Sequence, residues 1–265
     1  MKLEDQVVLV TGSTRGLGLA IANAFHREGV SLVLNCVSQA SFTNATSNVH
    51  VPGKAGSWSV SETGLVVMAD VTDGVEEVQF MFEEAAKYFG KPITTIVNNV
   101  LPGKFEFNGE GRKSIEQIDY RDFDVHFRGY IQGTLNTTTA ALPGLKTMGY
   151  GRIINIGSNL VHNPVVPYLD YTTGKAALLG LTRTLAKDLG LHGVTVNLVS
   201  GGLLQVTDAS AATPESVFAA VAASTPLGKC TTPEEVADAV LFFASPWSRG
   251  ITGQEMIVDG GLVMK

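Results

Sequence analysis

Residues 6–25 read QVVLVTGSTRGLGLAIANAF, and this stretch decides the fold. Residues 6–10 are typical of a buried β-strand, because apolar and mostly β-branched side chains follow one another without interruption. Residues 11–18 follow as a turn that contains three glycines. Ile21 and Phe25 then lie four residues apart, the spacing of one face of a helix. The predicted order is therefore strand, glycine-rich turn and helix.

The glycines of this turn have separate roles. Gly12 permits a tight turn after the strand. Gly16 and Gly18 carry no Cβ, so the backbone and the start of the helix can approach a pyrophosphate closely. The free N–H groups at a helix N-terminus also attract phosphate. The turn is thus predicted to bind a dinucleotide through Gly12, Ser13, Thr14, Arg15, Gly16, Leu17 and Gly18.

Further β-rich runs alternate with helical patterns along the chain. Such alternation is typical of a parallel sheet covered by helices on both faces. With 265 residues, of which 45% are hydrophobic, the chain can bury one large core. We predict an α/β fold, a single-domain Rossmann-type doubly wound parallel sheet of about seven strands that spans residues 1–265. The predicted strands are 6–10, 31–35, 65–69, 93–97, 152–157, 194–199 and 255–258.

Two helices have clear boundaries in the sequence. One is predicted over residues 120–148 and ends near Gly149. Another begins after Thr232, because a capping threonine is followed by Pro233 in the first turn and by Glu235 at the capping-box position.

Three stretches lack a clear pattern. Residues 38–64 fit either a short helix or an ordered loop. The loop at 101–118 is unusually long, and it carries Phe105 and Phe107 either to the substrate or to a neighbouring subunit. Residues 201–226 begin with a glycine pair suited to a hinge and contain a short apolar helix.

A second group of residues indicates proton transfer. Tyr171 and Lys175 are four residues apart, so on a helix they share one face. A neighbouring ammonium is expected to lower the pKa of the phenol, which is ordinarily ~10. Ser158 closes a predicted strand and can hydrogen-bond a carbonyl oxygen held against the phenol. Such a tyrosine and lysine pair is common on helix surfaces, and it is the preceding glycine-rich turn that favours chemistry.

Composition argues against several other classes of protein. A net charge of -6 and the absence of a basic run argue against nucleic acid or a membrane as partner. Cys36 and Cys230 are too few for a disulfide framework or a zinc site, so no metal is expected and a reducing compartment fits. The first residues lack the layout of a signal peptide, and no apolar run approaches the length of a membrane span. We therefore expect a cytoplasmic protein.

Along nearly its whole length the chain resembles the classical short-chain dehydrogenase/reductase family. The family's motifs occur here in order as Thr11-Gly12 to Gly16-Leu17-Gly18, Asp70-Val71, Asn98-Asn99, Ser158, Tyr171 with Lys175, Ile251 to Gln254, and Val258 to Gly261. Residues 155–171 look most like the 3-oxoacyl-(acyl carrier protein) reductase members. Family members are commonly homotetramers, so the resemblance implies that assembly here.

The resemblance implies roles for individual residues. Ser158 would orient and polarise a carbonyl oxygen, Tyr171 would donate a proton to it, and Lys175 would hold the nicotinamide ribose. In the family, the region at 201–226 closes over the substrate. Further cofactor contacts would come from Asp70 and Val71 at the adenine, from Asn98, from Gly202, and from Val206 and Thr207 at the carboxamide.

The choice of cofactor depends on the residues after the second predicted strand. In dinucleotide folds a carboxylate there, ~20 residues beyond the glycines, holds the ribose 2'-hydroxyl and repels a 2'-phosphate. Here residues 35–38 read Asn-Cys-Val-Ser, without a carboxylate, and Arg15 can pair with a phosphate. We therefore predict NADP(H), with Asn35 and Ser38 as further contacts.

The chain departs from the family pattern in three places. The asparagine that is usual on the long central helix, and that helps hold a water behind the lysine, falls at Tyr130. Residues 98–101 read Asn-Asn-Val-Leu in place of Asn-Asn-Ala-Gly, and Gly201-Gly202 replaces Pro-Gly. Either modest turnover or an unusual substrate would follow.

Together these features predict the NADPH-dependent reduction of a carbonyl to a secondary alcohol. The expected small-molecule substrate is a 3-oxoacyl thioester or a related ketone. Two alternatives stay open: an alcohol, sugar or steroid dehydrogenase that works oxidatively, and a noncatalytic NADP(H)-binding sensor.

Overall fold

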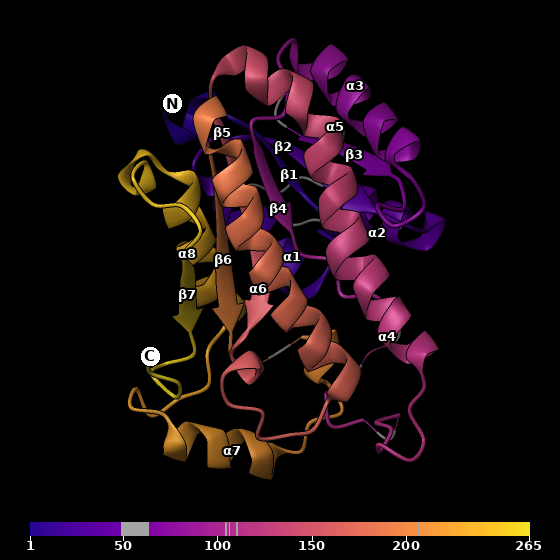
Figure 1. Cartoon of the computed structure of the whole chain (residues 1–265), viewed down its shortest axis with the longest axis vertical. Coiled ribbons are helices and arrows are strands. Elements are labelled where there is room, and N and C mark those ends of the chain that lie inside the picture. Colours follow the sequence, from indigo (N-terminus) through magenta and orange to yellow (C-terminus); the bar gives the residue numbers. More distant parts are fainter. Residues whose placement is uncertain (49–63, 104, 106, 110, 206) are drawn as a thin grey trace.

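A computed structural model describes residues 1–48, 64–103, 105, 107–109, 111–205 and 207–265. In these residues seven strands form one parallel sheet in the order β3-β2-β1-β4-β5-β6-β7 (Figure 1). The strands are β1 (Val7–Val10), β2 (Ser31–Cys36), β3 (Gly64–Met68), β4 (Thr95–Asn98), β5 (Gly151–Ser158), β6 (Val194–Gly201) and β7 (Glu255–Val258). The predicted doubly wound α/β fold is confirmed. Its strand order reverses between β1 and β4, where such sheets bind ligands.

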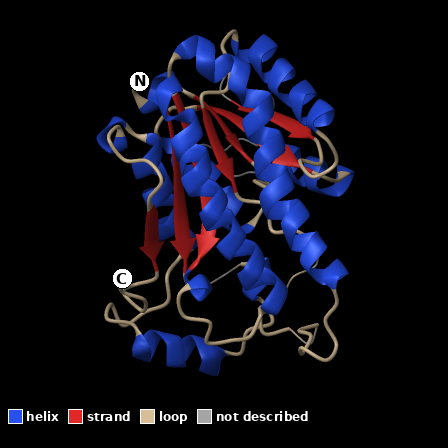
Figure 2. Ribbon diagram, in the orientation of Figure 1, coloured by secondary structure: helices blue, strands red, loops and turns tan. Residues whose placement is uncertain are grey.

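Helices cover both faces of the sheet (Figure 2). The described ranges contain α1 (Gly16–Arg27), α2 (Gln39–Asn48), α3 (Val75–Phe89), α4 (Tyr120–Phe127), α5 (Gly133–Met148), α6 (Leu169–Leu189), α7 (Glu215–Ser224) and α8 (Pro233–Ala244). Helices α1 and α8 pack on one face, and α3, α5 and α6 pack on the other. Helix α7 lies beyond the carboxyl ends of β5, β6 and β7 (Figure 1). Short 3-10 turns occur at Leu3–Asp5, Asn159–Val161, Gly190–His192, Asp208–Ser210 and Pro246–Ser248.

Strand β1 shows why the apolar runs are uninterrupted. Val8 and Val10 join the core beneath α1 and α8, whereas Val7 and Leu9 join the core beneath α3 and α5. Both sides of β1 are thus buried, so every position of this strand is apolar. Burial of each such side chain stabilises the fold by ~1.5–3 kcal/mol.

The long helix predicted over 120–148 contains a π turn. Helix α4 leads into the π turn η2 (Arg128–Gln132), and α5 continues to Met148. A Cβ on Gly129 would lie 2.5 Å from Cγ of Pro102, so the glycine lets the turn pack closely against the loop after β4. The sequence pattern indicated the helix but not the extra residue in its turn.

The other local expectations have clear outcomes. The capping box of α8 is confirmed, because the Thr232 N–H donates to Oε2 of Glu235 at 2.9 Å and the Glu235 N–H donates to Oγ1 of Thr232 at 3.4 Å. Of the stretch 38–64, residues 39–48 form the short helix α2. Residues 49–63 lie outside the described part of the chain.

Candidate active site

The glycine-rich turn after β1 forms one wall of a cavity of about 400 Å³. Gly12 and Gly16 have φ angles of 61° and 52°, a left-handed conformation that glycine adopts without strain. A Cβ on Gly18 would lie 2.3 Å from the carbonyl oxygen of Gly12, so only glycine fits where α1 meets the turn. The N-terminus of α1 therefore lies at the cavity, an arrangement that fits a phosphate group.

Asn99, at the end of β4, holds this turn in place. Its Nδ2 donates to the carbonyl oxygens of Thr11 at 3.0 Å and Gly12 at 3.3 Å, and its N–H donates to Oγ1 of Thr11 at 2.9 Å. From the sequence, Asn99 was predicted only as a member of the Asn98-Asn99 motif, without a role of its own. Its position after the strand that pairs with β1 was the signal for this supporting role.

Asn35 lies within the sheet and does not line the cavity. Its Nδ2 donates to the Ala69 carbonyl at 2.9 Å, and its Oδ1 accepts from the Gly12 N–H at 3.4 Å. Ser13 is also fully buried, and its Oγ accepts from the Asn35 N–H at 3.0 Å. Both predicted cofactor contacts therefore support the glycine turn from inside the fold.

The cavity wall after β2 is formed by Cys36, Val37 and Ser41. The predicted contact Ser38 lies beside them, and its Oγ accepts from the Ser41 N–H at 3.2 Å. This wall carries no carboxylate in its described residues. It therefore holds no negative charge that would repel a 2'-phosphate.

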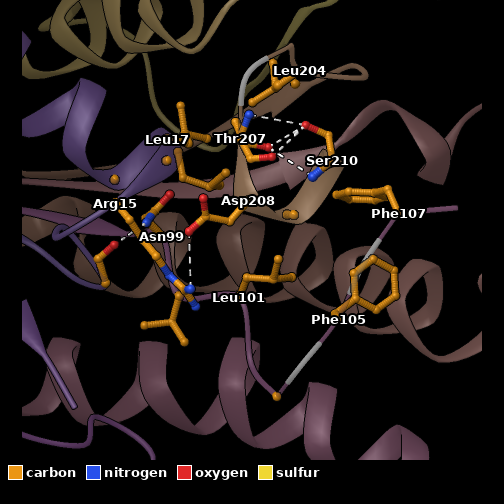
Figure 3. A pocket seen from close by; sticks show the side chains of 18 of the residues that line it. Arg15, Leu17, Asn99, Leu101, Phe105, Phe107, Leu204, Thr207, Asp208 and Ser210 are labelled. Carbon is orange, nitrogen blue, oxygen red and sulfur yellow. Dashed lines mark hydrogen bonds and ion pairs between the residues drawn. The ribbon is translucent and has the colours of Figure 1, made fainter. Parts of the chain in front are cut away.

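An ion pair crosses the cavity from the glycine turn (Figure 3). Nη1 of Arg15 lies 3.3 Å from Oδ2 of Asp208, and the two side chains are 72% and 70% exposed. The pair links the turn to the segment after β6, a connection that the sequence analysis did not foresee. Gly202 and Thr207 also line the cavity, as a cofactor role requires, and Val206 lies outside the described residues.

Three predicted cofactor contacts lie at strand ends beside the cavity but do not line it. Asp70 accepts hydrogen bonds from the N–H and Oγ1 of Thr72, at 2.9 and 2.8 Å. Val71 is buried. Asn98 donates to Oδ1 of Asn155 at 2.9 Å and accepts from Oγ1 of Thr137 at 2.8 Å. These side chains therefore organise the strand ends in the present arrangement.

The predicted catalytic residues come together at the carboxyl end of β5. Ser158 is the last residue of β5, and Tyr171 and Lys175 occupy the first two turns of α6. All three side chains are buried, and the Ser158 hydroxyl, whose Oγ accepts from the Leu160 N–H at 3.3 Å, lies close enough to the Tyr171 phenol to lower its pKa. Nζ of Lys175 donates to the Ile156 carbonyl at 2.6 Å and lies 5.9 Å from the Tyr171 ring centroid. Tyr171 and Lys175 also line the cavity that begins at the glycine turn.

Burial controls the pKa values of Tyr171 and Lys175, and its effect on Tyr171 is opposite to the one expected from the sequence. Burial raises the pKa of Tyr171 to about 12, and the nearby Ser158 hydroxyl only partly opposes it. Burial also lowers the pKa of Lys175 to about 7. We expected the ammonium to lower the pKa of the phenol. Instead, the ammonium lies nearer to Tyr130, 3.9 Å from that ring centroid, and the loss of water around Tyr171 dominates.

Two phenylalanines of the long loop exclude water from Tyr171. The Phe105 ring is stacked on the phenol with its centroid 4.8 Å away and an interplanar angle of 17°. Phe107 meets the same ring edge-on at 5.3 Å. Both phenylalanines line the cavity (Figure 3), so this loop contributes to the site of its own chain.

Backbone and side-chain hydrogen bonds join the loop at 101–118 to the segment after β6. The Phe107 N–H donates to the Ala209 carbonyl at 2.7 Å, and Nδ2 of Asn108 donates to Oγ1 of Thr213 at 3.1 Å. The Asn108 N–H also donates to Oη of Tyr168 at 2.7 Å. The two irregular stretches therefore meet above Tyr171, as a cover over a substrate pocket would.

Three further observations concern the rest of the chain. No helix among the described residues is long and apolar enough to span a membrane. The same residues contain no group of three or more His, Cys, Asp and Glu side chains placed to hold a metal ion. Cys36 and Cys230 are both buried and free.

Comparisons with known proteins agree with this geometry. A family model described as enoyl-(acyl carrier protein) reductase matches residues 12–263. The chain is 32% identical to the 3-oxoacyl-[acyl-carrier-protein] reductase of Pseudomonas aeruginosa, with 100% of each chain covered. It is 32% identical to the mouse (3R)-3-hydroxyacyl-CoA dehydrogenase, covering 100% of this chain and 98% of that one. Among solved structures, a blue fluorescent protein from a metagenomic library in complex with NADPH matches with a TM-score of 0.81 and 29% identity, over 100% of both chains.

Proposed function

Because the chain belongs to the short-chain dehydrogenase/reductase family, we propose that it reduces a carbonyl to a secondary alcohol with NADPH. The proposed substrate is a 3-oxoacyl thioester or a related ketone. One observation carries the proposal: the buried Tyr171 phenol, close to the buried Ser158, lines the cavity that begins at the glycine turn. A proton donor and a phosphate-binding turn thus share one cavity.

The chain's own residues supply the acid and its support. Bound NADPH would deliver a hydride to the carbonyl carbon. Tyr171 donates its proton to the carbonyl oxygen, and Oγ of Ser158 hydrogen-bonds the same oxygen as negative charge develops on it. Lys175 then stabilises the phenolate, because a positive charge is favoured beside a new negative charge in a dry site. Phe105 and Phe107 keep water away from the phenol.

The raised pKa of Tyr171 supports the reductive direction. With its pKa at about 12, the phenol carries its proton at neutral pH and is ready to donate it. Oxidation of an alcohol would instead require the phenolate, which burial disfavours. We therefore expect reduction to be faster than oxidation at pH 7, and to prevail up to alkaline pH.

The preference for NADP(H) rests on charge. The wall after β2 presents Cys36, Val37 and Ser41 where a carboxylate would select NAD(H), and Arg15 supplies a cation at the glycine turn. The NADPH complex of the metagenomic protein supports the same choice. The cofactor would lie along the cavity residues Gly12, Thr14, Gly16, Leu17, Gly18, Gly202 and Thr207. Asp70 and Val71 are proposed near its adenine, and Asn98 is proposed near its ribose at the end of β4. Equal or higher kcat/KM with NADH than with NADPH would contradict this preference.

The relatives and the cavity lining support the proposed substrate class. The two curated relatives are named for the 3-oxoacyl and 3-hydroxyacyl forms of one chemical pair. Leu101, Phe105 and Leu204 give the substrate side of the cavity an apolar lining that suits an acyl chain (Figure 3).

The deciding assay follows NADPH absorbance with a 3-oxoacyl thioester and with simple ketones. The Tyr171→Phe variant is the control, since it should bind NADPH nearly as well as the wild type and lose turnover. Tyr171-dependent reduction of the thioester supports the acyl substrate, and a preference for free ketones shifts the proposal to a general carbonyl reductase. Tight NADPH binding without any turnover would favour the noncatalytic sensor.

We also propose a homotetramer in the cytoplasm. Val125 and Leu135 are exposed on α4 and α5, as apolar contacts between subunits would be. The two free cysteines fit a reducing compartment. A monomeric mass by light scattering would contradict the assembly.

A further inference from the structure

The ammonium of Lys175 lies on the face of an aromatic ring. Its Nζ is 3.9 Å from the ring centroid of Tyr130, and its one hydrogen-bond acceptor among the described residues is the Ile156 carbonyl, at 2.6 Å. Among the described residues, no carboxylate forms an ion pair with Lys175. A buried ammonium without a carboxylate needs another source of negative potential, and the face of a tyrosine ring supplies one.

The Tyr130 ring is held from its other end. Oη of Tyr130 lies 3.3 Å from Nδ1 of His126, and Nε2 of His126 lies 3.4 Å from Oδ2 of Asp170. Burial lowers the pKa of His126, so the imidazole is neutral at pH 7 and carries one N–H. With that N–H on Nε2 facing Asp170, Nδ1 accepts the Tyr130 hydroxyl.

The same contacts lead back to the catalytic tyrosine. Oδ1 of Asp170 accepts from the Tyr171 N–H at 2.8 Å. A continuous series of contacts therefore runs from the Tyr171 backbone through Asp170 and His126 to Tyr130, and from that ring to the Lys175 ammonium. These contacts tie the Tyr171 backbone and the Lys175 side chain of α6 to α4 and the π turn.

Gly174 makes the room that the ring needs. A Cβ on Gly174 would lie 2.8 Å from Cδ2 of Tyr130 and 3.1 Å from Cβ of His126. Gly174 stands directly before Lys175 on α6, so a side chain there would push the ring away from the ammonium. Tyr130 and Gly174 are thus complementary in shape.

We propose that Tyr130 is a positioning residue, whose ring holds the Lys175 ammonium in place and is itself fixed by His126 and Asp170. The proposal rests on the proposed carbonyl reduction for its effect on rate. The contacts with Lys175 are independent of that reaction. In this chain an aromatic ring supports the lysine at the position where the family pattern has an asparagine.

The test compares two substitutions of Tyr130. Tyr130→Leu removes the ring face and should lower the pKa of Lys175 by about one unit, because a desolvated cation–π contact favours the charged form of the amine. Tyr130→Phe keeps the ring and should change that pKa by less than half as much. NMR titration of ¹³C-labelled lysine, with Lys175→Met to assign the signal, measures the pKa without any turnover. The other titratable groups near Lys175, namely Tyr171 and His126, stay unchanged in both Tyr130 variants.

Kinetics with NADPH and a 3-oxoacyl thioester give the second readout. We expect Tyr130→Leu to lower kcat/KM tenfold or more and to move its pH profile with the lysine pKa, and Tyr130→Phe to lose less than fivefold. Equal losses in both variants with an unchanged lysine pKa would overturn the proposal. An inactive wild type whose lysine pKa still responds to Tyr130→Leu would refute the carbonyl reduction alone.

A third variant guards against misfolding of Tyr130→Leu. Gly174→Ala should displace the ring and reproduce the fall in the lysine pKa, and it should have little further effect in the Tyr130→Leu background. Fully additive effects of Gly174→Ala and Tyr130→Leu would also overturn the proposal, because two residues that act through one contact cannot contribute independently.

Discussion

Replacing Lys175 by methionine is expected to stabilise the fold while it removes turnover. Burial lowers the pKa of the amine from 10.5 to about 7, which corresponds to ~5 kcal/mol against the charged form. This shift is the net result of lost hydration and of the favourable contacts of the ammonium with the Tyr130 ring and the Ile156 carbonyl. Methionine fills a similar volume without an amine. A gain of up to ~5 kcal/mol follows at or below pH 7, or a rise in Tm of up to ~10–20 °C for a chain of this size.

The gain should depend on pH in one direction. The folded-state pKa of Lys175 lies below its unfolded value, so the folded wild type is destabilised fully below about pH 7. That destabilisation disappears as the pH rises from about 7 to 10.5, where the amine is neutral in both states. The difference in unfolding free energy between Lys175→Met and wild type should therefore be largest at or below pH 7 and vanish near pH 10.5.

Urea unfolding followed by circular dichroism between pH 6 and pH 10.5 measures this difference. Tyr171→Phe is the matched control, because it should also lose turnover but leaves the buried ammonium in place. A Lys175→Met variant that is less stable than wild type at pH 7, by an amount that does not change with pH, would refute the reasoning. The lysine would then be retained for packing as well as for chemistry.

Three further outcomes are expected. Gly18→Ala should weaken NADPH binding at least tenfold by calorimetry and destabilise the fold by ~1–3 kcal/mol, because the alanine methyl group would lie 2.3 Å from a carbonyl oxygen. The control Gly180→Ala, on the open side of α6, should stabilise the fold by ~0.5–1 kcal/mol. Asp208→Asn frees Arg15 from an exposed ion pair worth ~0.2–1 kcal/mol, so KM for NADPH should fall up to ~5-fold at low salt, and an equal fall for NADH would contradict this. Phe105→Ala should admit water to the catalytic phenol and lower its pKa from about 12 toward ~10, measured as a shift of the alkaline limb of kcat/KM to lower pH.

Local sequence patterns predicted the elements and the spacing of the chemical groups. The uninterrupted apolar run at Val7–Val10 predicted a central strand, because apolar side chains at successive positions of a strand suit burial on both faces. The four-residue spacing of Tyr171 and Lys175 predicted that both face one side of α6, since helix geometry alone decides that. The start of α8 followed from its capping residues, because a capping box also depends only on residues close together in the chain.

Local sequence patterns could not predict the π turn or the role of Asn35. The π turn depends on how closely Gly129 approaches Pro102, two residues on different elements. Asn35 has the position of a cofactor contact in the sequence, but its amide pairs with the Ala69 carbonyl of the neighbouring strand connection. Neither partner can be identified until the chain is folded.

The sequence by itself determined the doubly wound sheet, the glycine turn and the presence of a serine, a tyrosine and a lysine at one strand end, because each depends on residues close together in the chain. Only the tertiary structure decided how those groups ionise. Phe105 comes from a loop far from Tyr171 in sequence, and its stacking removes the water that would otherwise keep the phenol near its usual pKa. Tyr130 reaches Lys175 from another helix in the same way. Desolvation and cation–π contacts depend on everything packed around a group, and that surrounding exists only in the folded chain.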